Sequence, residues 1–144
     1  MPAKEIIQLN GMEIHFSLDE NDTQNHMTMF RCVIHPHVRM PAPHYHRHFD
    51  EAVYGLKGTV IFTIDGREVP IAPGDSCFIP RGIVHGFNNK TDDAIEFLSV
   101  ITPGILGPSY FKDIAEVLNA GTPPDMSRLM AVMTKHGLVP VVTN

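Results

Sequence analysis

Histidines crowd one short stretch of the sequence, "HYHRHFDE", which runs from His44 to Glu51. Residues two apart on a β-strand face the same side, so a strand here would present the imidazoles of His44 and His46 together. A pair of neutral imidazoles on one face can chelate a transition metal ion. The stretch therefore predicts chemistry that depends on a metal.

A metal site of this kind needs further ligands. Glu51 has the opposite strand parity to His46, so it can join the histidines only if the chain bends or bulges between them. A second candidate segment is "GDSCFIPRGIVHGFNN", where Pro80 and Gly82 turn the chain and His85 begins the next predicted strand. Imidazole and carboxylate ligands together suit iron, manganese, nickel, copper, cobalt or zinc, and no thiolate is needed.

Other histidines surround this stretch. His48 shares strand parity with the first histidine pair and is the alternative ligand, although it lies close to Glu51. His35 and His37 flank Pro36 just before the site, where a single histidine is more often a loop or surface residue. We assign no role to these two.

The elements that must position these ligands are short strands. From about residue 11 to residue 101, apolar runs alternate with turn residues; the runs include "MTMFRCVI", "EAVYGL", "TVIFTI", "SCFIP" and "AIEFLSVI". Asp65-Gly66 and Pro73-Gly74 are typical of tight turns, so the strands should return antiparallel. Evenly spaced strands of this kind close into a barrel or sandwich. We expect an all-β fold built around an antiparallel β-barrel.

The pattern changes to helical spacing near the C-terminus. Ser109 can cap a first helix and Asp125 a second, and glycines at 121 and 137 can end them. The apolar residues expected to pack are Tyr110, Ile114, Val117 and Leu118 in the first helix, and Leu129, Met130 and Met133 in the second. We predict one domain over residues 1–144, with a barrel core at about 11–101 and two short helices at about 108–137.

Composition excludes several partners and compartments. The chain has 144 residues and a formal net charge of −5, which would repel a phosphate backbone, so nucleic acid is not an expected partner. The sequence has no apolar run long enough to span a bilayer and no basic segment followed by an apolar core at its start, so neither a membrane nor a signal peptide is expected. Two cysteines, Cys32 and Cys77, are too few for a disulfide scaffold. A cytoplasmic protein is the expectation.

Two motifs link the two ligand segments. The first combines His-x-His with a glutamate and a glycine, at His44, His46, Glu51 and Gly58. The second combines glycine, Pro-x-Gly, histidine and asparagine, at Gly74, Pro80, Gly82, His85 and Asn89. Together they resemble the cupin superfamily of small β-barrels, specifically its single-domain, quercetin-dioxygenase-like type. One position departs from the family pattern, because Val38 stands where the first motif usually opens with glycine.

The resemblance implies both a ligand set and an assembly. The family's metal ligands correspond here to His44, His46, Glu51 and His85. They would hold one divalent transition metal ion, namely iron, manganese, nickel, zinc, copper or cobalt. Cupins of this type commonly pair, so a homodimer is expected.

The chemistry expected at such a site follows from its open positions and its walls. Four ligands leave adjacent positions free on a metal that accepts six. Val53, Phe62 and Phe87 share strand parity with inward-facing neighbours and would give the barrel pocket an apolar lining. We expect a metal-dependent oxygenase acting on a small aromatic or enol-type molecule. The alternatives are a metal-dependent isomerase or lyase, and a non-catalytic protein that binds a small ligand.

Overall fold

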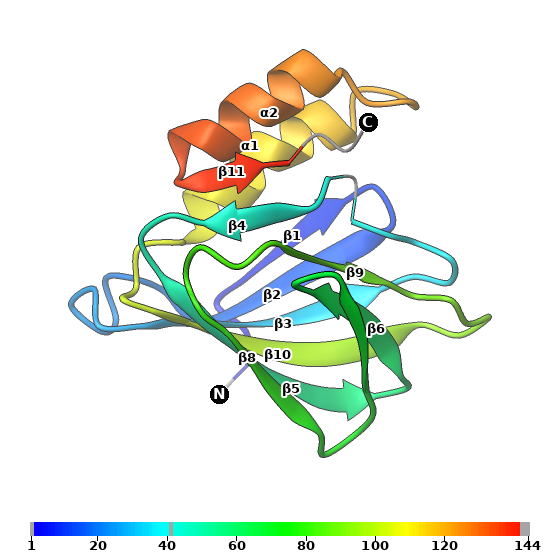
Figure 1. Ribbon diagram of the computed structural model, residues 1–144. Helices are drawn as coiled ribbons and strands as arrows, with labels where there is room; N and C mark the ends of the chain where they lie inside the picture. The colour runs from blue at the N-terminus through cyan, green and yellow to red at the C-terminus, as the bar shows by residue number, and fades with distance from the viewer. Residues whose placement is uncertain (1, 41, 142–144) are drawn as a thin grey trace.

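The computed structural model describes residues 2–40 and 42–141, which form a barrel of two antiparallel sheets with two helices at one end (Figure 1). The six-stranded sheet has the order β1 (Glu5–Leu9), β2 (Met12–Leu18), β3 (Thr28–Ile34), β10 (Ile95–Thr102), β5 (Asp50–Lys57), β8 (Ser76–Ile79). The five-stranded sheet has the order β11 (Leu138–Pro140), β4 (His44–His46), β9 (His85–Asn88), β6 (Val60–Ile64), β7 (Arg67–Ile71). The predicted antiparallel all-β barrel is confirmed.

The core lies between the inner faces of the two sheets. Along β3 and β10, buried residues alternate with partly exposed ones, as the strand period of two requires. Phe62 from the five-stranded sheet meets Phe97 from the six-stranded sheet, with ring centroids 5.3 Å apart. Their edge-to-face contact closes the barrel interior with aromatic packing.

Positive backbone φ angles shape the predicted turn at Asp65-Gly66 and the chain just after β5. Asp65 and Gly66 both have positive φ, 51° and 77°, and join β6 to β7 as a two-residue hairpin loop. Gly58, at the end of β5, has a φ of 64°, and a Cβ atom there would lie 2.6 Å from Cγ2 of Ile95. A side chain at Gly58 would therefore be strained by the backbone and crowded by the core.

The helices are α1 (Pro108–Leu118) and α2 (Met126–Lys135). The predicted cap of α2 is confirmed, because Asp125 Oδ1 accepts a hydrogen bond from the Arg128 backbone N–H at 3.2 Å. The predicted cap of α1 is wrong: Gly107 holds that position and Ser109 lies inside the first turn. Pro108 explains the difference, since its fixed φ suits the first helical position.

Strands at both ends of the chain extend the barrel beyond the limits predicted for its core. β1 precedes residue 11, and β11 follows α2 and pairs with β4, placing Leu138 opposite His46 and Pro140 opposite His44. The helices lie beside β4 and β11 at one end of the barrel (Figure 1). In the described part of the chain, neither helix is long and apolar enough to cross a membrane.

Candidate metal centre

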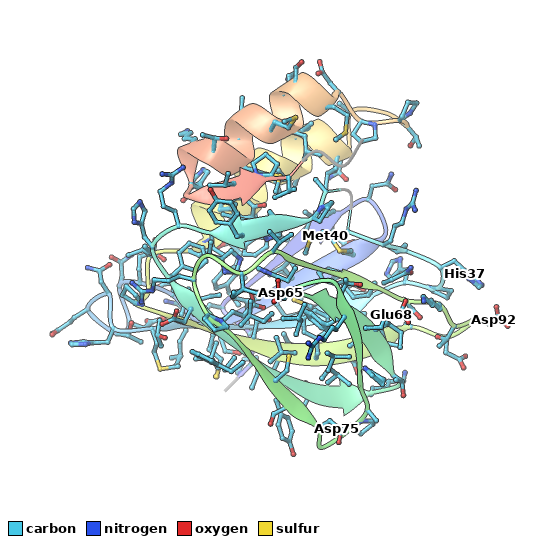
Figure 2. The ribbon with its side chains drawn as sticks, viewed as in Figure 1. His37, Met40, Asp65, Glu68, Asp75 and Asp92 are labelled. Carbon is cyan, nitrogen blue, oxygen red and sulfur yellow. The ribbon has the colours of Figure 1, made fainter. Side chains whose placement is uncertain are left out.

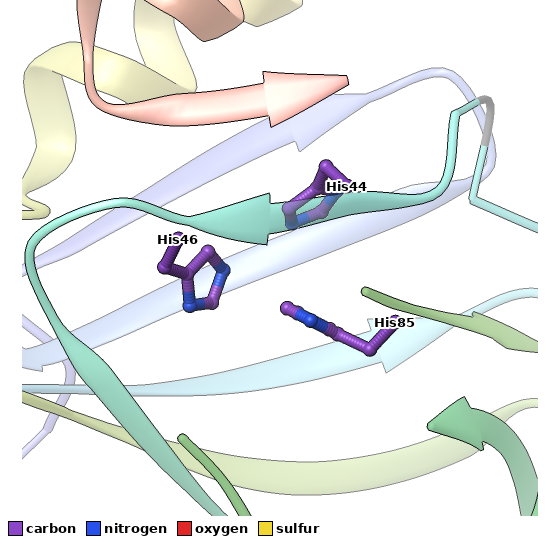
Figure 3. A group of neighbouring side chains, drawn as sticks. All are labelled: His44, His46 and His85. Carbon is purple, nitrogen blue, oxygen red and sulfur yellow. The ribbon is translucent and has the colours of Figure 1, made fainter. Parts of the chain in front are cut away.

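The two sheet-forming histidine segments meet inside the barrel. β4 carries His44 and His46, and β9 begins at His85, which pairs in register with His44. All three side chains are buried, and one nitrogen of each lies within 4.8 Å of the others. Figure 3 shows the rings of His44 and His46 extending from β4 toward the ring of His85. Strand parity thus places His44 and His46 on one face of β4, and the pairing of β4 with β9 adds His85.

Backbone carbonyls orient two of the rings. His44 Nδ1 lies 3.2 Å from the Ala42 carbonyl oxygen, and His85 Nδ1 lies 3.0 Å from that of Ile83. Each contact requires the proton on Nδ1, which leaves the Nε2 lone pair free. An imidazole whose other nitrogen is held in this way is prepared for metal ligation.

Stacking orients the third ring. His46 lies against Phe49, with ring centroids 4.3 Å apart and an interplanar angle of 24°. Its Nδ1 is buried without a hydrogen-bond partner among the described residues. The orientation of the His46 ring therefore depends on Phe49, to which the sequence analysis above assigns no role.

The three imidazoles are neutral at neutral pH. Burial, with repulsion from His85, lowers the pKa of His44 to about 3. Burial, with repulsion from the other two histidines, lowers the pKa of His46 to about 2, and burial also lowers the pKa of His85. Neutral imidazoles have free lone pairs, so this donor set fits a transition metal ion.

Glu51 reaches the same centre because the chain bends after β4. Residues 47–49 carry the chain from the five-stranded sheet into β5 of the six-stranded sheet, which resolves the opposite parity noted in the sequence. Glu51 Oε1 lies 3.8 Å from His46 Nε2 and 4.0 Å from His85 Nε2. Two ligands each about 2.1 Å from one metal ion are at most about 4.2 Å apart, so both separations are compatible with a shared ion. Among the described residues, the group whose ligand atoms all lie within 4.8 Å of one another contains the three histidines and not Glu51.

Ser99 holds the other oxygen of this carboxylate. Its hydroxyl, buried on β10, donates a hydrogen bond to Glu51 Oε2 at 2.8 Å. Burial raises the pKa of Glu51 to about 7, and the bond from Ser99 opposes that rise. A nearby cation would further favour the ionised carboxylate. Sequence reasoning missed Ser99, which lies 48 residues from Glu51 along the chain and carries no local motif.

An ion pair joins the two ligand segments. The Asp50 carboxylate accepts hydrogen bonds from the Arg81 backbone N–H at 2.8 Å and from its Nε and Nη2 at 3.2 and 3.0 Å. The Gly82 N–H also donates to the His46 carbonyl oxygen at 2.9 Å. These contacts fix the loop before His85 against the start of β5. Asp50 therefore helps to position the loop that leads to His85.

The remaining candidate histidines lie elsewhere. His48 is exposed and stands outside the group of three buried imidazoles. His35 Nε2 lies 3.3 Å from Glu13 Oε2 on the surface. His37 Nε2 lies 2.6 Å from Asp92 Oδ1, at a loop end away from the helices (Figure 2).

A cavity of about 90 Å³ reaches the candidate ligands from inside the barrel. Phe62 and Phe87 are among its lining residues. Val53 is only 1% exposed but does not belong to the described lining, and it packs in the core instead. The wall is apolar except at the ligands, Cys32, Ser99 and Tyr110.

The chain is similar to proteins with different functions. It is 29% identical over 73 residues to quercetin 2,3-dioxygenase of Bacillus subtilis strain 168. This aligned stretch covers 51% of this chain and 21% of that protein. It is 40% identical over 58 residues to the oxalate-binding protein of Thermotoga maritima, covering 40% of this chain and 48% of that one. A sugar phosphate isomerase from Silicibacter pomeroyi superposes with a TM-score of 0.56 and 27% identity over 64% of this chain and 59% of that chain. The chain spans less than half the length of both curated relatives.

One family model covers the candidate centre. The model of the cupin domain matches residues 30–101, which contain His44, His46, Glu51 and His85. This stretch is half of the chain, 72 of 144 residues, and runs from β3 through β10. The matched stretch, the antiparallel barrel and the buried histidine group agree, and the chain belongs to the cupin domain family.

Proposed function

We propose that this chain is a metal-dependent oxygenase that acts on a small aromatic or enol-type molecule. One observation carries the proposal: three buried, neutral imidazoles form one group, with the Glu51 carboxylate beside two of them, in the wall of a cavity that is otherwise mainly apolar. We assign His44, His46, Glu51 and His85 as the ligands of one divalent transition metal ion. The metal would supply open coordination positions where a substrate and dioxygen can meet.

The cavity wall supports the substrate class. The lining residues that the structure describes include no lysine, arginine, asparagine or glutamine. A phosphorylated sugar or a dicarboxylate would therefore find no cationic or amide side chain there for the groups that do not reach the metal. A neutral molecule with adjacent metal-binding oxygens and an apolar body suits the same space, and the apolar wall would exclude water from the reacting atoms.

Two alternatives come from the relatives. A metal-dependent isomerase or lyase would resemble the sugar phosphate isomerase, with the metal stabilising an enolate. A non-catalytic ligand-binding protein would resemble the oxalate-binding protein. The described lining has no cationic side chain, which argues against both a phosphorylated ligand and a dicarboxylate ligand.

Oxygen consumption distinguishes these functions. Elemental analysis of protein purified without added metal identifies the ion, and an oxygen electrode then screens catechols, flavonols and 1,3-diketones. We expect dioxygen uptake that requires both metal and substrate, with metal-depleted protein as the control. Turnover under anaerobic conditions would support an isomerase or lyase instead. A melting-temperature shift with no turnover would support a binding protein.

Replacing Ser99 by alanine should weaken metal binding about tenfold to a hundredfold, the usual cost of losing a residue that orients a metal ligand. Without the hydroxyl, Glu51 loses the hydrogen bond that fixes its Oε2. Competition with a chelator of known affinity measures the change. Ser76→Ala, at an exposed position on β8, is the matched control and should leave affinity unchanged. Equal affinities in both variants would show that Ser99 does not position the carboxylate.

We retain the homodimer as a proposal that rests on the family resemblance. Light scattering should give twice the 16.0 kDa mass of the chain, whereas the mass of a single chain at micromolar concentration would contradict the dimer.

A further inference from the structure

The cavity extends past the candidate ligands into a region built by the C-terminal segment, residues 106–138. This segment contributes apolar walls from α1, α2 and the residues on either side of them: Leu106, Ile114, Leu118, Leu129, Met133 and Leu138. We call the space that these six residues line the apolar compartment. It lies outside residues 30–101, the stretch that matches the cupin domain.

The apolar compartment is joined directly to β4, the strand that carries His44 and His46. β11 pairs with β4, so that Leu138 lies opposite His46. The Arg47 N–H also donates to the Gly137 carbonyl oxygen at 2.9 Å. Backbone hydrogen bonds thus fix the position of the compartment relative to the candidate ligands.

The chemistry of these walls is nearly uniform. Among the lining residues described for the segment, Tyr110 is the only polar one, and it is mostly buried. None of them carries a charge. A charged or strongly hydrated group placed here would lose its water without gaining a partner, whereas an alkyl or aryl group would be transferred from water to an apolar surface.

We propose that the apolar compartment binds an alkyl or aryl arm of the same ligand whose oxygens bind at His44, His46, Glu51 and His85. We choose this occupant because the four candidate ligands and the six residues of the apolar compartment line one continuous cavity. The assignment of the oxygen-bearing head rests on the proposed function. The assignment of the arm rests on the walls alone.

A series of 1,3-diketones tests the arm. One end of each diketone stays a methyl group, and the other is lengthened from methyl to propyl to pentyl. Binding to the Co²⁺-loaded protein is followed by the visible spectrum of the cobalt ion. We expect the dissociation constant to fall about fourfold for each added methylene, as burial of apolar surface predicts, until the compartment is full.

Two matched variants locate the effect. Ile114→Phe adds bulk in the compartment and should remove the gain from the longer arms. Ile105→Phe makes the same change at an exposed position outside the cavity and should leave the gain intact. Circular dichroism checks that both variants fold. If Ile114→Phe does not fold, the arm-length series on the unaltered protein decides whether the compartment binds the arm.

Toluene provides a test that does not depend on the metal. It has no metal-binding oxygen, so a rise in the melting temperature of metal-free protein would support the compartment, and the rise should be smaller in Ile114→Phe. Diketones that bind with affinities independent of arm length would overturn the inference and leave the proposed function standing. Toluene binding without any diketone binding to the Co²⁺-loaded protein would support the compartment and contradict the proposed function.

Discussion

Replacing His85 by alanine should reduce bound metal from stoichiometric to background. His85 is the proposed ligand that β9 brings from the second motif, and its ring lies next to the imidazoles of His44 and His46. Loss of a residue that only orients a ligand costs about tenfold to a hundredfold in affinity, so loss of the ligand itself should exceed that range. Elemental analysis after extensive dialysis measures the metal content.

His48→Ala is the matched control for this variant. His48 is exposed and lies outside the buried group, so its removal should leave metal content unchanged. Melting curves and circular dichroism establish that both variants are folded. If His48→Ala lost the metal and His85→Ala kept it, the ligand assignment would be wrong by a register.

Chelation of the metal should end dioxygen uptake completely while the chain stays folded. The barrel buries large side chains such as Phe16, Phe62 and Phe97 independently of the ligands, unlike a zinc finger whose core is too small to fold without its metal. The candidate histidines are neutral, so the metal-free barrel does not have to bury three positive charges at neutral pH.

Circular dichroism and oxygen uptake on one chelated sample make the comparison. Metal at a hundred times its dissociation constant adds about 2.7 kcal/mol to the free energy of unfolding, so its removal should lower the melting temperature by roughly 5 to 10 °C. Uptake should return when metal is restored. An unfolded chelated chain would make the metal structural, and full activity after chelation would remove the metal from the mechanism.

Strand periodicity was sufficient to predict that His44 and His46 face the same side, because side-chain direction on a strand depends only on position. It also identified the difficulty at Glu51, whose opposite parity required a bend between the two histidines and the carboxylate. The structure places that bend at residues 47–49, where the chain changes sheets. The hairpin at Asp65-Gly66 could also be predicted from neighbouring residues alone, since both residues accept positive φ.

Features that depend on distant parts of the chain could not be predicted in this way. Ser99 meets Glu51 only because β10 pairs with β5, and nothing near either residue specifies that pairing. β11 is three residues long and contains Pro140, so its sequence does not look like a strand. Its pairing with β4 comes from the placement of α2, which the local pattern does not determine.

The pairing of β4 with β11 also affects how the protein matures during synthesis. The ribosome makes β4 early, but its partner strand emerges only after the rest of the barrel and both helices. Until then one edge of the histidine-bearing strand has unpaired backbone groups, which is a liability for a nascent chain. The long sequence separation of this pair also delays its closure. The strand that supplies two candidate ligands should therefore be among the last parts of the barrel to reach its final hydrogen bonding.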